Sequence, residues 1–208
     1  MKQPITSFSD KHRVFLFDFD GTLFDSAGLK VEIAEKLKQY TDNSELLWET
    51  ERQLRGRKFH LVETMRVFCE QIGMETSEFS IQNILLYHNF PDFVFPEAIS
   101  TLEKLHNDNI LAIFSEGDEI YQQFKIHQSR LSQSVDFTYI FPKKQNHLAE
   151  IVKFFGQKKI WYVDNQLYQL QLAHQQFSDI TTVWINRENL QPNVDFHPTH
   201  TITSLEQL

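Results

Sequence analysis

Cysteine is nearly absent from this sequence. It occurs once in 208 residues, at Cys69, so no disulfide can form within the chain. A lone thiol is typical of a protein from a reducing compartment. Met65 and Ile72 lie about one helical turn before and after Cys69, so we expect a buried structural thiol rather than a nucleophile.

Long apolar runs and positive charge are also scarce. No run approaches membrane-spanning length and the first residues lack a signal segment, so we expect a cytoplasmic protein with no membrane partner. The 20 lysine and arginine residues, against 28 aspartate and glutamate residues, leave a net charge of −8. Nucleic-acid binding requires a basic surface, so we expect no nucleic-acid partner. An anionic small molecule would have to be held by local basic groups or by a metal.

The chain does contain an apolar stretch that ends in two carboxylates. Residues 14–23 are VFLFDFDGTL, which predicts a strand buried on both faces of a parallel sheet, followed by a turn. Residues i and i+2 of a strand point the same way, so Asp18 and Asp20 converge at its carboxyl end, where open α/β sheets bind ligands. Close like charges are unfavourable unless a cation or a shared proton intervenes. The structural alternative is an ordinary acidic turn with Asp-Gly punctuation.

The rest of the chain alternates between two periodicities. Apolar runs predict further strands, and helical spacing predicts helices between them from Pro96 onward, which favours a mostly parallel, doubly wound α/β sheet. The expected strands cover residues 14–17, 110–114, 137–141, 160–163 and 181–185, and residues 186–208 are expected to form a loop with a short final segment. Between residues 27 and 90 the pattern is helical throughout, with four helices near residues 29–40, 47–54, 62–72 and 81–85. We therefore expect a core of residues 1–23 and 91–208 and an inserted helical domain of residues 24–90.

Polar residues that suit phosphate chemistry follow the later strands. Ser115 comes after the second strand and can donate to a phosphate oxygen, while Gly117 permits a close backbone approach. Lys143 and Lys144 follow the third strand, and Asp164 ends the fourth. Ser115 and Gly117 also fit an ordinary Ser-x-Gly turn, and a pair of lysines at a strand end, seen alone, is more often a solvated turn.

Together these residues resemble the four motifs of the haloacid-dehalogenase (HAD) superfamily, whose first motif is Asp-x-Asp-Gly-Thr-Leu. The resemblance implies a Rossmann-like core with a helical cap that closes over the site. It implies that Asp18 is the nucleophile, that Asp20 is the general acid and base, and that Ser115 and one lysine contact the phosphate. We prefer Lys144, because Lys143 directly follows Pro142. The other phosphate-binding candidates are Gly21, Thr22, Gly117 and Lys143.

The resemblance also implies a Mg²⁺ ion. Its expected ligands are the carboxylates of Asp18 and Asp164, the backbone carbonyl of Asp20, and Asn165, which can orient a bound water. The family usually has a second acid where this chain has Asn165 or Tyr168, so we expect weak Mg²⁺ binding. Two further acids, Glu116 and Asp118, would repel phosphate unless they point away or meet a basic group.

A basic cluster in the expected cap is the candidate for binding the rest of the substrate. Arg55 and Lys58, on either side of a glycine, are the best candidates for contacting an anionic group. The alternative is a solvated helix face. The cluster consists of Arg52, Arg55, Arg57, Lys58, His60 and Arg66.

The sequence therefore predicts a Mg²⁺-dependent phosphatase that hydrolyses a small phosphorylated metabolite through an aspartyl-phosphate. A phosphotransferase or mutase with the same intermediate, or a catalytically weak HAD-fold binding protein, are the alternatives. We do not expect a haloacid dehalogenase, because that chemistry needs no Mg²⁺ and Asp20 supplies the second aspartate of the family's phosphatases. His197 and His200 lack a third ligand nearby and are expected at the surface. The sequence does not indicate an oligomeric state.

Overall fold

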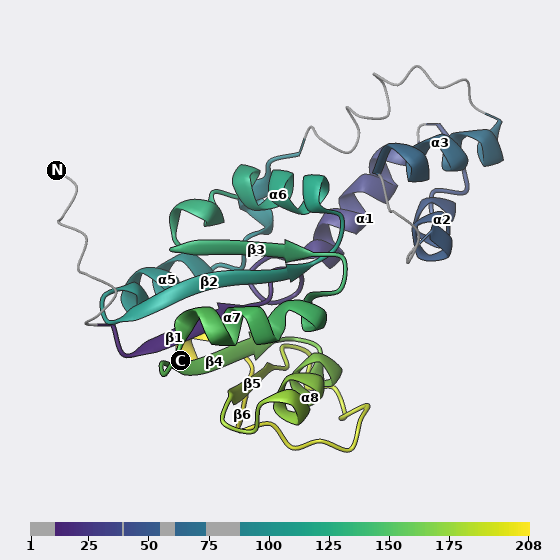
Figure 1. Ribbon diagram of the computed structural model, residues 1–208. Coiled ribbons are helices and arrows are strands. Elements are labelled where there is room, and N and C mark those ends of the chain that lie inside the picture. Colours follow the sequence, from purple (N-terminus) through teal and green to yellow (C-terminus); the bar gives the residue numbers. More distant parts are fainter. Residues whose placement is uncertain (1–10, 39, 55–60, 74–87) are drawn as a thin grey trace, which may run out of the picture.

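The computed structural model describes residues 11–38, 40–54, 61–73 and 88–208. They form a six-stranded parallel sheet in the order β3-β2-β1-β4-β5-β6, flanked by helices (Figure 1). The strands are β1 (Arg13–Phe17), β2 (Asn109–Glu116), β3 (Phe137–Phe141), β4 (Lys159–Asp164), β5 (Thr181–Ile185) and β6 (His200–Ile202). The chain proceeds outward from β1 in both directions, so a topological switch point lies at β1, where ligands bind in such sheets.

The sheet is covered on both faces, which explains why its central strands β1 and β2 are mostly apolar. Phe15 and Phe17 of β1 pack with α5 (Ala98–His106) and α6 (Glu119–Gln128) on one face. Val14 and Leu16 pack with α7 (Leu148–Phe155) and α8 (Leu167–Gln176) on the other. These alternating positions are all buried, so the β1 strand is fixed rigidly between two cores, and its carboxyl end is a firm base for a site.

Helices alone connect β1 to β2 within the described residues. They are α1 (Ser26–Leu37), α2 (Leu46–Leu54), α3 (Leu61–Ile72), the short η1 (Phe90–Phe93) and α5, and α2 and α3 lie away from the sheet in Figure 1. Asp25 caps α1 by accepting a hydrogen bond from the Gly28 N–H at 2.9 Å. The side chains of Met65 and Cys69 are buried, as expected. The helix expected near residues 81–85 lies outside the described residues, and the limits of a cap domain stay a prediction. No described helix has the length and apolar character needed to cross a bilayer.

Several expected boundaries were wrong. Ser115 lies inside β2 rather than after it, because this strand continues its pairing with β3 as far as Glu116. The C-terminal segment adds a sixth strand at His200–Ile202, whose three residues are too short to show a periodic pattern. Pro96 lies in the turn before α5, and Tyr40 lies beyond the end of α1.

Candidate active site

The turn after β1 brings two carboxylates to the carboxyl edge of the sheet. The Asp18 N–H continues the ladder by donating to the Val163 carbonyl at 2.9 Å. The chain then turns sharply, since the Phe19 carbonyl accepts hydrogen bonds from the backbone N–H groups of residues 22, 23 and 24. Gly21 has a φ of +80°, and a Cβ there would lie 2.3 Å from the Asn165 side chain. The glycine is therefore required by both its backbone conformation and the closeness of the next loop.

One buried lysine joins the first carboxylate to the acid at the end of β4. The Lys144 ammonium lies 2.6 Å from a carboxylate oxygen of Asp18 and 2.7 Å from one of Asp164. All three side chains are almost fully buried. Lys144 opens the short helix η3 (Lys144–His147), whereas Lys143 is exposed. The structure thus brings together Asp18, Lys144 and Asp164, as the sequence predicts, and leaves Lys143 away from this cluster.

Burial sets the ionisation of this cluster. Burial raises the pKa of Asp18 to about 7, with Asp164 adding to the rise and Lys144 opposing it. Burial also works against the charge of Lys144, but Asp164 and Asp18 outweigh it and raise the lysine pKa well above its ordinary value. Lys144 is thus a permanent cation between two acids, suited to stabilise negative charge that gathers on Asp18 or on a group bound to it.

Asp164 is held in place by groups that the motif does not include. The Tyr162 hydroxyl donates to Asp164 at 2.8 Å, and the backbone N–H of Gln166 donates to its other oxygen at 2.7 Å. Burial and the Asp164 charge raise the pKa of Tyr162 well above its usual value, so the phenol stays a proton donor. The sequence analysis missed Tyr162, although its position two residues before Asp164 on the same strand places both on one face.

Thr22 connects the two loops at the sheet edge. Its hydroxyl lies 3.5 Å from Asp18 and accepts a hydrogen bond from the Asn165 N–H at 3.1 Å. The Trp184 indole donates to the Asn165 carbonyl at 3.0 Å. Thr22 is fully buried, so its hydroxyl is better placed to hold the Asn165 loop than to contact a ligand.

Asp20 has a separate set of partners from α6. The Lys125 ammonium lies 2.5 Å from one carboxylate oxygen, which also accepts from the Ser26 hydroxyl, and the Gln122 amide lies 2.5 Å from the other. Burial alone would raise the pKa of Asp20, but Lys125, Gln122 and Ser26 outweigh it and hold the pKa below its ordinary value. The sequence analysis missed Gln122 and Lys125, because their three-residue spacing is ordinary on any helix.

The end of β2 supplies a hydroxyl and a close backbone approach. The Gln122 amide nitrogen lies 3.1 Å from the Ser115 hydroxyl and 2.8 Å from the Glu116 carbonyl. Gly117 has a φ of +150°, and the Gln122 side chain lies 3.0 Å from where a Cβ would be. Asp118 caps α6 by accepting from the Tyr121 N–H at 2.8 Å, and a Glu116 carboxylate oxygen accepts from the Lys144 N–H at 3.1 Å. Both acids thus have structural partners.

The oxygen donors expected for a metal lie at this same edge. The Asn165 side-chain oxygen is buried and has no hydrogen-bond partner among the described residues. The described residues contain no group of three or more His, Cys, Asp or Glu side chains arranged as a metal site, so any cation would use two carboxylates with amide and carbonyl oxygens. When Asp18 is ionised, the carboxylates of Asp18, Asp20 and Asp164 face only two lysine charges, which leaves an excess of negative charge. This donor set and charge fit a hard divalent cation such as Mg²⁺.

The expected substrate-binding cluster is only partly described. Arg55, Lys58, Arg57 and His60 lie outside the described residues. Arg66 is exposed on α3 and pairs with Glu63 and Glu70 of the same helix, which matches a solvated helix face.

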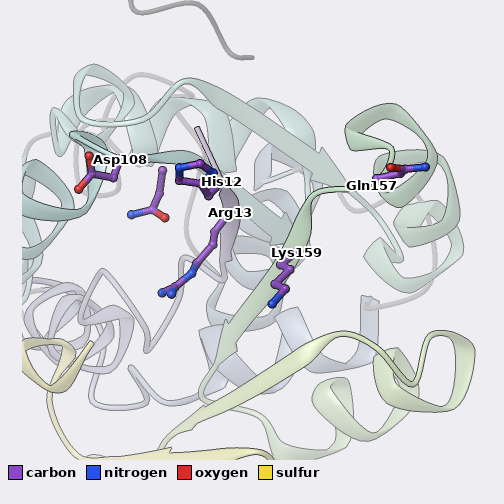
Figure 2. Close-up of a pocket in the computed structure, with 6 residues that line it drawn as sticks. His12, Arg13, Asp108, Gln157 and Lys159 are labelled. Carbon is purple, nitrogen blue, oxygen red and sulfur yellow. The ribbon is translucent and has the colours of Figure 1, made fainter. Parts of the chain in front are cut away.

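An open hollow of about 760 Å³ lies at the opposite edge of the sheet (Figure 2). Its lining includes Arg13, Asn109 and Lys159, the first residues of β1, β2 and β4. Ligands of open α/β sheets bind at the carboxyl ends of the strands, so this hollow is separate from the candidate active site.

Comparisons with solved structures agree with the fold. A haloacid dehalogenase-like hydrolase from Burkholderia xenovorans has a TM-score of 0.82 at 22% identity, covering 95% of this chain and 97% of that one. The HAD hydrolase YfnB from Bacillus subtilis, described as bound to magnesium, has a TM-score of 0.66 at 18% identity, covering 95% and 96%. The L-2-haloacid dehalogenase from Xanthobacter autotrophicus, with chloropropionic acid covalently bound, has a TM-score of 0.66 at 16% identity, covering 93% and 95%.

A comparison with curated proteins found no match. The family model described as haloacid dehalogenase-like hydrolase matches residues 12–158, which include β1, the two aspartates that follow it, Ser115 and Lys144. With this match over most of its length, the chain belongs to the haloacid dehalogenase-like hydrolase family.

Proposed function

We propose that this hydrolase cleaves a small phosphate monoester with the help of Mg²⁺, through an aspartyl-phosphate at Asp18. The observation that carries the proposal is Asp20, a second carboxylate at the same strand end with donors on both of its oxygens. A phosphate ester has a poor leaving group that needs a proton, and a fixed carboxyl group beside the nucleophile can deliver it.

The residues would divide the reaction as follows. The ionised Asp18 carboxylate attacks phosphorus as the bond to the ester oxygen breaks, and Asp20 gives its proton to the departing oxygen. Asp20, now ionised, takes a proton from the water that hydrolyses the acyl phosphate, which regenerates both carboxyl groups. Lys144 stabilises charge at Asp18 throughout, and Ser115 can donate to a phosphoryl oxygen.

A Mg²⁺ ion held by Asp18, Asp164, the Asn165 oxygen and the Asp20 carbonyl would neutralise the charge of the phosphate. The excess negative charge of the site supports this role, because a phosphate dianion would otherwise be repelled.

A panel of phosphorylated metabolites, assayed with Mg²⁺ and with a chelator, tests the proposal. We expect Mg²⁺-dependent phosphate release that is abolished by Asp18→Asn and reduced about 10²–10⁴-fold by Asp20→Asn. Release of phosphate by folded Asp18→Asn at a substantial rate would contradict the nucleophile assignment. Including sugar acceptors in the panel distinguishes hydrolysis from phosphotransfer, and binding without turnover would indicate a HAD-fold binding protein.

Hydrolysis of a 2-haloacid is the second candidate. Lys144 already bridges Asp18 and Asp164 directly, so a small substrate with a single negative charge could react without a metal. The L-2-haloacid dehalogenase from Xanthobacter autotrophicus, with chloropropionic acid covalently bound, shares this fold. A halide leaves without a proton, so this reaction gives Asp20 no role as an acid. Halide release from 2-chloropropionate in the presence of chelator would favour this candidate.

A further inference from the structure

The carboxylate of Asp20 is fixed by residues of α6. Lys125 and Ser26 contact one of its oxygens and Gln122 contacts the other, although the side chain of Asp20 is still 32% exposed. A carboxylate with donors on both oxygens has little freedom to rotate, and the exposed part of this one is open to solvent. We call Gln122 and Lys125 the α6 pair.

Lys125 is an unusual choice for stability alone. Its side chain is 7% exposed, and its ammonium lies 5.1–5.9 Å from the ring centroids of Tyr121, Phe19 and Phe24. A buried ion pair contributes little net stability, and an apolar side chain of similar volume often replaces one without loss. Methionine would suit this aromatic surrounding, so the charge of Lys125 is explained better by its partner Asp20 than by packing.

Gln122 ties the same carboxylate to the end of β2. Its amide nitrogen lies within hydrogen-bond distance of Asp20, of the Ser115 hydroxyl and of the Glu116 carbonyl. It can lie there because residue 117 is a glycine. Gln122 and Lys125 are three residues apart and therefore on one face of α6, whose start is fixed by its Asp118 cap.

We propose that Lys125 and Gln122 are positioning residues, which hold the Asp20 carboxyl group where it can protonate the leaving oxygen of a phosphate ester. This inference rests on the proposed function. A displacement of about 1 Å of such a group can cost about 10²-fold in rate. The rate lost when Lys125 or Gln122 is replaced should therefore be larger for an ester whose leaving group needs a proton.

Phenyl phosphate and p-nitrophenyl phosphate test this, because they differ little in shape while nitrophenolate leaves readily without a proton. In Lys125→Met we expect kcat/KM for phenyl phosphate to fall at least about 10-fold further than kcat/KM for p-nitrophenyl phosphate. We compare kcat/KM because it reports the attack of Asp18 and the departure of the leaving group, and not the hydrolysis of the acyl phosphate, which is the same for both esters. Lys125→Arg, which keeps the charge, should restore most of the difference. Gln122→Leu should show the same selective loss.

Lys11→Met is the matched control. Lys11 is also buried, with its side chain 6% exposed, and pairs with Asp136 at 3.5 Å, but it precedes β1 and so lies at the opposite edge of the sheet. Its loss should leave the ratio of the two rates unchanged. An equal loss on both esters in Lys125→Met would overturn the inference, since a general structural defect acts on both alike.

The two proposals fail in different ways. A wild-type protein that hydrolyses neither ester, or hydrolyses them without Asp18, would contradict the proposed function and with it the catalytic part of the inference. Crystal structures of wild type and Lys125→Met then decide the positioning part. We expect the Asp20 carboxylate to leave its wild-type orientation in the variant, and an unchanged orientation would overturn the role of Lys125.

Discussion

Replacing Asp18, the proposed nucleophile, with asparagine should make the ligand-free protein more stable, and increasingly so as the pH rises. Burial raises the pKa of Asp18 from its ordinary 3.8 to about 7 in the folded protein. The folded state therefore binds the Asp18 proton more tightly than the unfolded state. This contribution to stability is fully present below about pH 4 and is lost as the pH rises to about 7.

The magnitude follows from that shift. The pKa difference is about 3 units, and each unit corresponds to about 1.4 kcal/mol, so ionising Asp18 costs the fold about 4 kcal/mol. Asparagine keeps the shape and an oxygen acceptor for Lys144 but never ionises. The free energy of unfolding of Asp18→Asn, minus that of wild type, should therefore grow by up to about 4 kcal/mol between pH 4 and pH 7, and level off above.

Urea unfolding at half-unit pH steps, with chelator present, measures this difference. Most other titrating groups are common to both proteins and cancel in the subtraction. Asp164→Asn is the comparison variant, since it removes the other acid that pairs with Lys144. Because the Asp164 charge raises the pKa of Asp18, this substitution should lower that pKa, and the stability of the variant relative to wild type should therefore also depend on pH. A difference between Asp18→Asn and wild type that stays constant, or shrinks as the pH rises, would refute the reasoning.

Three further predictions concern the same edge of the sheet. Lys144→Met should lower the free energy of unfolding by about 3–5 kcal/mol at pH 8, measured by urea titration, because two buried carboxylates lose their shared cation; a loss below 1 kcal/mol would contradict the ion-pair description. Gly21→Ala should cost about 1–3 kcal/mol more than Gly156→Ala, since both glycines have positive φ but, among the described residues, a Cβ would meet a neighbour at Gly21 and none at Gly156; equal thermal shifts would speak against the clash. Calorimetry should find that a phosphate mimic tightens weak Mg²⁺ binding, and that Mg²⁺ tightens the mimic equally; equal Mg²⁺ affinities with and without it would disprove the coupling.

The parallel sheet could be predicted because four of its strands, β1, β2, β4 and β5, are mostly buried on both faces. Such strands are continuous apolar runs, and their order along the chain with intervening helices leaves few topologies. The sixth strand could not be predicted, since His200–Ile202 pairs through its backbone and carries mixed side chains. The boundary at Ser115 was wrong for a related reason: strand pairing with β3, not hydrophobicity, decides where β2 ends.

Some residues of the candidate site could likewise be predicted from the sequence, and others could not. Asp18, Lys144 and Asp164 could be placed together because each lies at the end of a strand or just after it, and parallel strands bring their carboxyl ends to one edge. Lys144 rather than Lys143 lies in the cluster, as the preceding proline indicated. The pairing of Lys125 with Asp20 spans more than 100 residues, and no local pattern marks it. It depends on how α6 packs, which is a property of the tertiary structure.

The two carboxylates of the first motif differ in charge balance, and the difference has a consequence for the reaction. Asp18 shares one lysine with a second acid and its pKa is raised, whereas Asp20 has a lysine of its own and its pKa is lowered. The attack step needs the opposite order, an ionised Asp18 and a protonated Asp20. A divalent cation beside Asp18 lowers its pKa, and a phosphate dianion beside Asp20 raises that of Asp20. In the proposed reaction, binding of a cation and a phosphate ester would shift both pKa values toward this reversed order, so the site would approach its reactive protonation state when both are bound. A lone halide-bearing acid without a cation brings no such reversal, which favours the phosphate ester as substrate.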